Sequence, residues 1–269
     1  MTPAQETTTN VYAAPRTVTD LAACDFYHSM EIPGYGEVEG EWDLRGGEAA
    51  YLGKVDVRGK RVLEIGTASG FMCFYMERAG GEVVAFDLSP DQDIDAVPFA
   101  GSDHARQTEA LRTHVGRINN GFWLAHAAHG SRARVAYGSV YAPPPGLGTF
   151  DVSTFGSVLL HLRDPFLALQ NVLGRTRETV VVTDVGVRTA FRLPLRASQV
   201  LGGPLFFRPD ASTGEPRVTW WRLTPQVVQR MVAVLGFERS DVTHHSQTFN
   251  GRKRGLFTVV GHRTRPAPA

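Results

Sequence analysis

Cysteine is scarce in this chain, which has two cysteines, Cys24 and Cys73, among 269 residues. Two thiols are too few for a disulfide framework or for a metal site built from thiolates. We therefore expect the protein in a reducing compartment, and the cytoplasm fits best.

Long apolar runs and metal-ligand patterns are missing as well. No stretch approaches the ~20 uninterrupted apolar residues that a membrane-spanning helix needs, and the first ten residues lack the basic and apolar regions of a signal peptide. Nine histidines are present, but none form an H-x-x-x-H pair. His244 and His245 are adjacent in an expected strand and therefore point to opposite faces. We expect neither a membrane partner nor a bound metal.

Charge is unevenly distributed along the chain. The formal net charge is +1, yet residues 186–269 carry 13 basic and four acidic side chains (13 − 4 = +9). A basic last third can meet an anionic substrate or nucleic acid. The arginines are scattered singly apart from Arg252 and Arg254, which flank Lys253, so a solvated surface is the simpler interpretation and nucleic acid is not favoured.

Apolar strand-like segments alternate with helix-like segments, a pattern typical of βαβ units on a parallel sheet. Thr224 and Pro225 have the residue types of a helix N-cap and first helical position. The expected strands are 61–65, 82–87, 133–137, 150–155, 178–184, 237–246 and 255–262, and the expected helices are 71–79, 104–129, 165–175 and one beginning at 225.

Segment 186–223 interrupts this alternation. It is rich in Pro, Gly, Arg and aromatic residues and lies between a strand and a helix. A connection of this length is usually a functional loop or lid. We expect one domain at 19–263, with a cofactor core at about 59–185 and cap elements at 19–58 and 186–223, between flexible ends at 1–18 and 264–269.

A glycine-bordered bend joins the first two expected elements. Gly66 permits a sharp turn and close approach of a ligand, and Gly70 permits close helix–strand packing. Asp87 ends the next strand 21 positions after Gly66, a spacing that suits a carboxylate bound to two ribose hydroxyls. Ala68 stands where a dinucleotide fingerprint has its middle glycine, so the loop favours an adenosine ligand without a pyrophosphate. The alternative is a tight turn with no ligand.

These residues resemble motif I of the class I S-adenosylmethionine (SAM)-dependent methyltransferases. The matching run is 62–71, and the likeness is greatest to the branch with tRNA wobble-uridine carboxymethyltransferases and bacterial small-molecule methyltransferases. Further matches lie at 84–87, 133–135, 138–141, 155–165 and 219–237, and the resemblance covers about 26–262. It implies a Rossmann-like α/β fold with a mostly parallel sheet and an antiparallel last strand, with SAM as cofactor and S-adenosylhomocysteine (SAH) as product.

The resemblance also implies site residues. Glu64, Gly66, Ser69 and Gly70 would line the methionine and ribose end, with Thr67 and Ala68 in the same loop. Asp87 would hold the ribose. Leu88, Ser139 and Val140 would flank the adenine, Gly156 and Ser157 would lie under the reacting methyl, and Trp42 and Arg45 would close an N-terminal segment over the cofactor.

Two departures from the tRNA-modifying relatives favour a small acceptor. The chain is too short for their larger helical N-terminal region, and Leu160 stands where they place a tyrosine before the histidine. Many relatives also have an acid at the position of Ser139.

Residues near the expected methyl position are candidates for chemistry. His161 is either a general base or a structural histidine bonded to a loop carbonyl. Asp184, which we expect to face the same crevice, is a base, a substrate anchor or a helix-cap acceptor. His28 is a third catalytic candidate; with Tyr27 and Glu31 it lies in a segment that forms either a lid or a surface helix.

The late aromatic and basic residues are candidates for acceptor binding. Trp220 or Trp221 would stack a planar or cationic acceptor, or pack the lid onto the core. Arg208 and Arg222 would bind an acidic acceptor, or remain solvated.

The sequence thus predicts SAM-dependent methyl transfer to an O or N atom of a small molecule, in bacterial secondary metabolism. A tRNA-modifying methyltransferase is the main alternative. An adenosine-nucleotide-binding oxidoreductase and a catalytically silent SAM-binding protein are alternatives of other classes.

Overall fold

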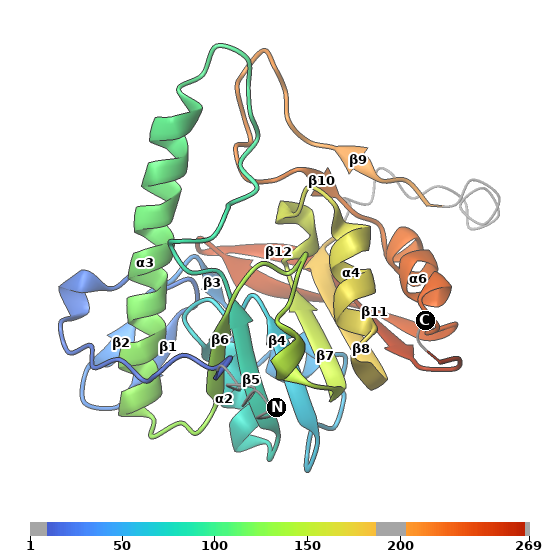
Figure 1. Ribbon diagram of the computed structural model, residues 1–269, viewed down its shortest axis with the longest axis horizontal. Coiled ribbons are helices and arrows are strands. Elements are labelled where there is room, and N and C mark those ends of the chain that lie inside the picture. The colour runs from blue at the N-terminus through green and yellow to red at the C-terminus, as the bar shows by residue number, and fades with distance from the viewer. Residues whose placement is uncertain (1–9, 187–202, 267–269) are drawn as a thin grey trace, which may run out of the picture.

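An eight-stranded β-sheet runs through the middle of the molecule (Figure 1). The computed structural model describes residues 10–186 and 203–266. In spatial order the strands are β3 (Trp42–Asp43), β11 (Arg239–Phe249), β12 (Arg252–His262), β8 (Thr176–Val185), β7 (Phe150–Gly156), β4 (Arg61–Ile65), β5 (Glu82–Asp87) and β6 (Arg134–Tyr137).

The five neighbouring strands β8, β7, β4, β5 and β6 are parallel to one another. Strand β12 is antiparallel to β8, β11 is antiparallel to β12, and β3 is antiparallel to β11. The predicted α/β fold with a mostly parallel sheet and an antiparallel last strand is confirmed.

Helices cover both faces of the sheet because its central strands are apolar on both sides. Val83 and Ala85 of β5 pack in the cluster that contains α1 (Glu48–Tyr51), α2 (Phe71–Arg78) and α3 (His104–Ala128). Val84 and Phe86 of β5 point the other way, into the cluster with α4 (Pro165–Leu173) and α6 (Pro225–Val234). As predicted, the Thr224 hydroxyl caps α6 by accepting from the Val227 N–H.

The last hairpin is longer than predicted. The expected strands 237–246 and 255–262 continue to Phe249 and back from Arg252. Asn250 and Gly251 form the two-residue turn, and both have positive φ angles of 46° and 71°. At the outer ends of these two strands, polar residues do not alternate with apolar ones. The expected strands were therefore shorter than the observed ones. Trp42 and Phe249 pair across β3 and β11, an edge the sequence did not predict.

Two segments meet above the carboxyl ends of the parallel strands. The connection from β5 to α3 and the segment containing β9 (Phe206–Phe207) and β10 (Trp221–Arg222) run side by side at the top of Figure 1. Their contacts include Val97 N–H to the Arg217 carbonyl at 2.8 Å. Part of the predicted cap, 187–202, lies outside the described residues, as do 1–9 and 267–269 of the expected flexible ends.

The remaining short elements belong mainly to the N-terminal segment and to the loops. They are η1 (Leu21–Ala23), β1 (Met30–Ile32), β2 (Gly36–Val38), η2 (Pro145–Leu147) and η3 (Leu159–His161). Strands β1 and β2 form a separate antiparallel hairpin. Within the described ranges, no helix has the length and apolar character needed to cross a bilayer.

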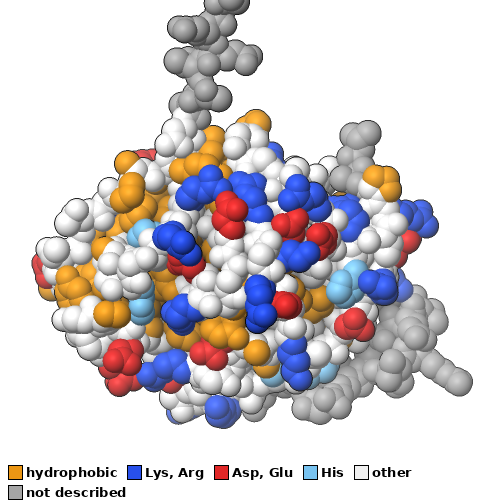
Figure 2. Space-filling view, turned by 90° about the horizontal axis from the view of Figure 1, so that it is seen from below, with side chains coloured by type: hydrophobic (Ala, Val, Ile, Leu, Met, Phe, Trp, Pro, Cys, Tyr) orange, Lys and Arg blue, Asp and Glu red, His pale blue; other side chains and the backbone are white. Residues whose placement is uncertain are grey.

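Basic and acidic side chains are interspersed on the lower face of the molecule. Figure 2 shows Lys and Arg side chains next to Asp and Glu side chains there. Ion pairs at the starts of the parallel strands have the same mixed character, such as Lys60 with Glu178 at 2.7 Å and Arg134 with Glu82 at 2.6 Å. Mixed charge of this kind weakens the attraction of a surface for a polyanion.

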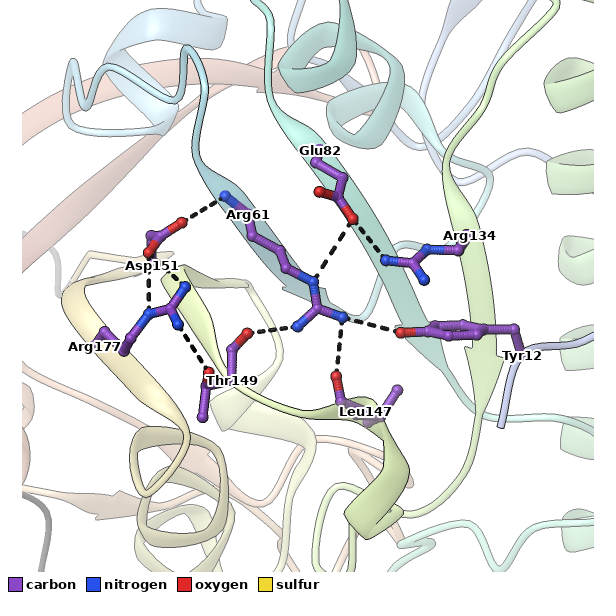
Figure 3. Close-up of polar contacts among 8 residues, drawn as sticks. All are labelled: Tyr12, Arg61, Glu82, Arg134, Leu147, Thr149, Asp151 and Arg177. Atoms are coloured by element: carbon purple, nitrogen blue, oxygen red, sulfur yellow. Dashed lines mark hydrogen bonds and ion pairs between the residues drawn. The ribbon is translucent and has the colours of Figure 1, made fainter. Parts of the chain in front are cut away.

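Arg61 ties the amino ends of several strands together (Figure 3). Its guanidinium donates to the carbonyls of Leu147, at 2.9 Å, and Thr149, and to the Tyr12 hydroxyl at 3.0 Å. Glu82 lies 3.7 Å away. Because this side chain is 22% exposed, its hydrogen bonds are partly shielded from water.

Arg61→Met should lower the free energy of unfolding by about 2–4 kcal/mol, because several acceptors lose a charged donor while the apolar stem is kept. Urea denaturation measures this. Arg177→Met is the matched control: this side chain is 54% exposed and pairs with Asp151, so its loss should cost about 0–1 kcal/mol. Equal losses in the two variants would contradict the assignment.

Candidate active site

The bend after β4 is built from residues with positive φ angles. Gly66, Ala68 and Gly70 have φ angles of 75°, 50° and 91°. A Cβ atom on Gly66 would lie 2.4 Å from a methyl carbon of Val158, so no side chain fits there without displacing that residue. Ala68 holds a conformation that costs a non-glycine residue of order 1 kcal/mol, and such positions cluster at functional sites.

Asp87 is fixed against this bend by two backbone hydrogen bonds. Its Oδ2 accepts from the Ala68 N–H at 2.7 Å, and its Oδ1 accepts from the Leu88 N–H at 2.7 Å. Burial raises the pKa of this carboxyl, although the two N–H groups act in the opposite direction. Each oxygen keeps a lone pair for a further donor, so the carboxylate can accept from two ligand hydroxyls.

A cavity of about 310 Å³ opens at the carboxyl ends of the parallel strands. Its walls come from the bend after β4, the ends of β5 to β7, η3, α3 and the two segments above the sheet. Eight of the residues predicted for cofactor binding line it: Gly66, Ala68, Asp87, Leu88, Ser139, Val140, Gly156 and Ser157.

A second, smaller cavity of about 20 Å³ lies beside the first. The two share Ile65, Gly66 and Gly156 as lining residues. The polar residues around the small cavity are His28, Tyr51, Glu64, Thr154 and Thr183. Burial raises the pKa of Glu64 to about 7 and lowers the pKa of His28 to about 4.

The other predicted loop residues support these walls instead of lining them. The Thr67 hydroxyl donates to Glu64 Oε2 at 2.6 Å, and the Ser69 hydroxyl accepts from the Tyr27 N–H at 3.2 Å. Gly70 is the N-cap of α2, and an added Cβ atom would meet Phe74 at 2.5 Å.

Trp42 and Arg45 are not among the residues that line either cavity. The Trp42 ring is buried against Phe249, with 4.8 Å between centroids. The Arg45 guanidinium is paired with Asp43 at 2.7 Å and with Glu37. They were expected to close an N-terminal segment over the cofactor. The structure instead places this segment at the far edge of the sheet, where β3 pairs with β11.

His161 lines the large cavity, and its ring orientation is defined. Nδ1 lies 2.6 Å from the Val218 carbonyl, which can only accept, so Nδ1 carries the proton. Nε2 is then the unprotonated nitrogen, and no described residue bonds it. Burial lowers the pKa of His161 although the Val218 carbonyl raises it. Both predicted roles, base and carbonyl-bonded histidine, are compatible with this geometry.

Asp184, which was expected to face the crevice, is not among the residues that line either cavity. Its neighbour Thr183 of β8 lines the small cavity, and successive strand residues point to opposite faces. Oδ1 of Asp184 accepts from the Val185 N–H at 2.6 Å, while Oδ2 is buried without a hydrogen-bond partner. Burial raises the pKa of Asp184 to about 7, against the lowering effects of backbone N–H groups and of Arg222.

Asp184→Asn should make the protein more stable at alkaline pH. The raised folded-state pKa means that the carboxyl's favourable contribution is present below about pH 4 and is lost as pH rises through about 7. An amide does not ionise, so the variant should gain about 2–4 kcal/mol of unfolding free energy at pH 8 and nothing at pH 4. Denaturation at both pH values measures this, with the exposed Asp241→Asn as control. A variant less stable than the parent at pH 8 would contradict the assignment.

Most of the predicted acceptor-binding residues lie in the cap or at the surface. Tyr27 lines the large cavity, and burial raises its pKa to about 12. Trp220 is buried and its indole N–H donates to the Asp95 carbonyl at 2.6 Å, whereas the Trp221 indole donates to the Arg163 carbonyl at 3.3 Å.

The two tryptophans therefore join the cap to the core, which is one of their two expected roles. Glu31, Arg208 and Arg222 are not among the residues that line either cavity.

Several lining residues were missed at the level of sequence. Ile94 and Asp95 come from the connection before α3, and Leu111, His114 and Val115 from α3 itself. Their sequence resembles an ordinary loop and surface helix, and only the fold brings them over the sheet. Tyr51, Thr154 and Thr183, around the small cavity, were missed for the same reason.

No protein-family model matches this sequence, and a sequence search of curated proteins finds no match. Solved structures do share its fold. The N-terminal domain of EvdMO1 with SAH bound is 16% identical, with a TM-score of 0.51 over 90% of this chain and 93% of that chain. The same domain in the presence of SAH and D-fucose is 17% identical, with a TM-score of 0.52 over the same shares.

A third structure is the 1,6-didemethyltoxoflavin-N1-methyltransferase of Burkholderia thailandensis with bound 1,6-didemethyltoxoflavin and SAH. It is 14% identical, with a TM-score of 0.51 over 82% of this chain and 78% of that chain. The chain therefore has the Rossmann-like fold of class I methyltransferases, as predicted.

Proposed function

We propose that this chain is a SAM-dependent methyltransferase that acts on an O or N atom of a small molecule, in bacterial secondary metabolism. The proposal is carried by Asp87, whose two oxygens are fixed by backbone N–H groups at the edge of a cavity at the carboxyl ends of the strands. The solved structures of the same fold include small-molecule methyltransferases with SAH bound. The scarcity of cysteine supports a cytoplasmic location.

The residues present fit this cofactor in three respects. Asp87 would accept from the two ribose hydroxyls. Leu88, Ser139 and Val140 line the large cavity where an adenine would lie beside them. Glu64 would accept from the amino-acid end, since its carboxyl borders the small cavity next to Gly66.

Bound SAM supplies a sulfonium-activated methyl group. The protein's task is then to position the acceptor and exclude water. Gly156 and Ser157 form the cavity wall at the end of β7, and the two segments above the sheet contribute lining residues, 93–95 from one and Val218 from the other. His161 accepts the acceptor's proton through Nε2 and holds the resulting charge against the Val218 carbonyl.

In this proposal, the cofactor core and the cap have different roles. The core is at about 59–185, and the cap is at 19–58 and 186–223. The core binds the cofactor, and the cap shapes the acceptor's space. Tyr27 and the buried Trp220 represent the two predicted cap elements near the cavity. The connection before α3, through Asp95, is a third cap element that we add.

The alternatives receive less support. A tRNA substrate would need a continuous basic surface, whereas the arginines of the basic last third are scattered singly apart from Arg252 and Arg254. A dinucleotide oxidoreductase would need room for a pyrophosphate at Ala68, whose N–H is already bonded to Asp87.

Calorimetry with SAM, SAH and NAD tests the class of ligand. We expect micromolar binding of SAM and SAH and no binding of NAD. Transfer of a radiolabelled methyl group to a panel of phenols, catechols and amines then tests catalysis, with tRNA as a separate arm. Tight NAD binding without SAM binding would overturn the proposal, and SAM binding without transfer to any acceptor would favour the silent binding protein.

A further inference from the structure

His161 places a basic nitrogen in the wall of the large cavity. Its Nδ1–H donates to the Val218 carbonyl at 2.6 Å, so Nε2 keeps its lone pair and has no partner among the described residues. Val158 and Leu162, which come from the same stretch of chain, line this cavity, as does Val218. The base therefore lies in a wall whose neighbouring residues are apolar.

The wall of the large cavity offers no cationic side chain to an anionic acceptor. None of its described lining residues is a lysine or an arginine, whereas three are aspartates, Asp87, Asp93 and Asp95. His114 also lines the cavity, but its Nδ1 lies 3.0 Å from a carboxylate oxygen of Asp25. A carboxylate that leaves water for a cavity needs a paired cation. This wall therefore disfavours an acidic acceptor.

The arginines on neighbouring segments do not supply the missing charge. The Arg163 guanidinium lies over the ring of Trp220, 4.9 Å from the centroid. Arg222 lies close enough to Asp184 to lower the pKa of that carboxyl. Neither arginine lines a cavity, and the same holds for Arg208. The described residues thus favour an acceptor without a negative charge.

The chemistry of methyl transfer decides which uncharged acceptor gains from a base. An aromatic amine attacks with a free lone pair while it still carries its protons, so its methylation does not depend on a base in the same step. A hydroxyl oxygen is a weak nucleophile that loses its proton as the new bond forms. The pKa of a phenol, about 10 as in tyrosine, makes that proton much easier to remove than the proton of an alcohol. The single base in this wall therefore suits a phenolic hydroxyl.

We propose that the acceptor is an uncharged aromatic hydroxyl compound, whose ring lies against Val158, Leu162 and Val218 and whose hydroxyl donates to His161 Nε2. As the phenolic oxygen bonds to the methyl carbon, the bond from this carbon to sulfur breaks and its electron pair stays on sulfur. The phenolic proton moves to Nε2 and is later released to water. The products are an aryl methyl ether and SAH. The inference rests on the proposed function and names its substrate class.

Three benzene derivatives that differ in one substituent separate the acceptor classes. They are 4-propylphenol, 4-propylaniline and 4-propylbenzoate, and they present a hydroxyl, an amine and a carboxylate on the same ring. Calorimetry measures the binding of each to the full chain saturated with SAH, and transfer of a radiolabelled methyl group from SAM is measured separately. We expect 4-propylphenol to bind at least 10-fold more tightly than 4-propylbenzoate, at roughly neutral pH, and to be the compound that is methylated.

His161→Gln should split binding from chemistry. Transfer to 4-propylphenol should fall by about 10²- to 10⁴-fold, while its binding to the SAH complex should stay within about 5-fold because the amide oxygen still accepts from the hydroxyl.

A change of charge in the wall tests the rejection of anions. Asp93→Lys should improve the affinity for 4-propylbenzoate relative to 4-propylphenol by about 3- to 10-fold. Asp91→Lys is the matched control: Asp91 is exposed and lies two residues earlier, but it does not line the large cavity, so the ratio should stay as in the parent.

Two kinds of result would overturn the proposal. If 4-propylbenzoate bound as tightly as 4-propylphenol, or if the phenol did not bind the SAH complex, the class of compound would be wrong. If the phenol bound without being methylated, or if the aniline were methylated faster, the acceptor group would not be a hydroxyl. Failure of the proposed function differs from these results, because the parent chain would then bind neither SAM nor SAH before any acceptor is added.

Discussion

Asp87→Asn should lower the affinity for SAM by about 100-fold. Two hydrogen bonds from the ribose hydroxyls lose their negatively charged acceptor, and each such bond contributes about 1.5–3 kcal/mol to the binding free energy. The amide oxygen of asparagine still accepts one of them, so part of this free energy is kept. In the parent, Ala68 and Leu88 each donate a backbone N–H to one carboxylate oxygen at 2.7 Å. The amide nitrogen of asparagine is itself a donor, so it would face one of these N–H groups without forming a hydrogen bond. Calorimetric titration with SAM measures the change.

Asp93→Asn is the matched control for this prediction. Asp93 lines the same cavity, but it is exposed and no backbone N–H of the described residues donates to its carboxylate. We expect its affinity for SAM to stay within about 3-fold of the parent. If both variants bound SAM as the parent does, Asp87 would not be the ribose ligand, and the adenosine site would have to be placed elsewhere.

The sequence predicts those site residues that lie at the ends of neighbouring parallel strands. The bend at Gly66 follows β4 directly, and Asp87 ends the adjacent parallel strand, so Ala68 and Asp87 are in contact although they lie 19 positions apart in the sequence. Alternating strands and helices fix which strand ends share an edge. The same logic places Gly156 at that edge, because β7 pairs with β4.

The part that the sequence does not predict depends on contacts between distant segments. Asp95 accepts from the Tyr141 hydroxyl and from the Arg163 N–H, and its carbonyl accepts from Trp220. None of these pairings has a local sequence pattern. The cap over the cavity therefore includes the connection before α3, whereas the sequence pointed to the N-terminal segment and the late insertion.

Errors at single residues have equally specific causes. Asp184 was expected to face the crevice, but it lines neither cavity, whereas Val181 and Thr183 of the same strand line the small one. Trp42 was expected at the cofactor because it precedes motif I, but two residues of β3 attach it to β11 at the sheet edge. Its backbone N–H donates to the carbonyl of Tyr27, a residue that does line the large cavity.

His161→Gln should reduce the single-turnover rate of methyl transfer by about 10²- to 10⁴-fold while leaving SAM affinity within about 2-fold. The imidazole has Nδ1 on the Val218 carbonyl at 2.6 Å and Nε2 without a protein partner among the described residues, whereas an amide has no basic nitrogen. The rate is measured with SAM saturating and with the acceptor that the panel identifies.

The pH dependence provides a second readout for the same residue. Only the neutral imidazole accepts a proton, and burial lowers the pKa of His161 below its ordinary value of 6.5, so the parent's rate should hold to below pH 6.5 before it falls. His161→Gln should lose this acidic limb. His114→Gln is the matched control, since His114 lines the same cavity with its Nδ1 3.0 Å from Asp25, and it should stay within about 3-fold of the parent. A large loss in His114→Gln together with a normal rate in His161→Gln would move the base to the helical wall of the cavity.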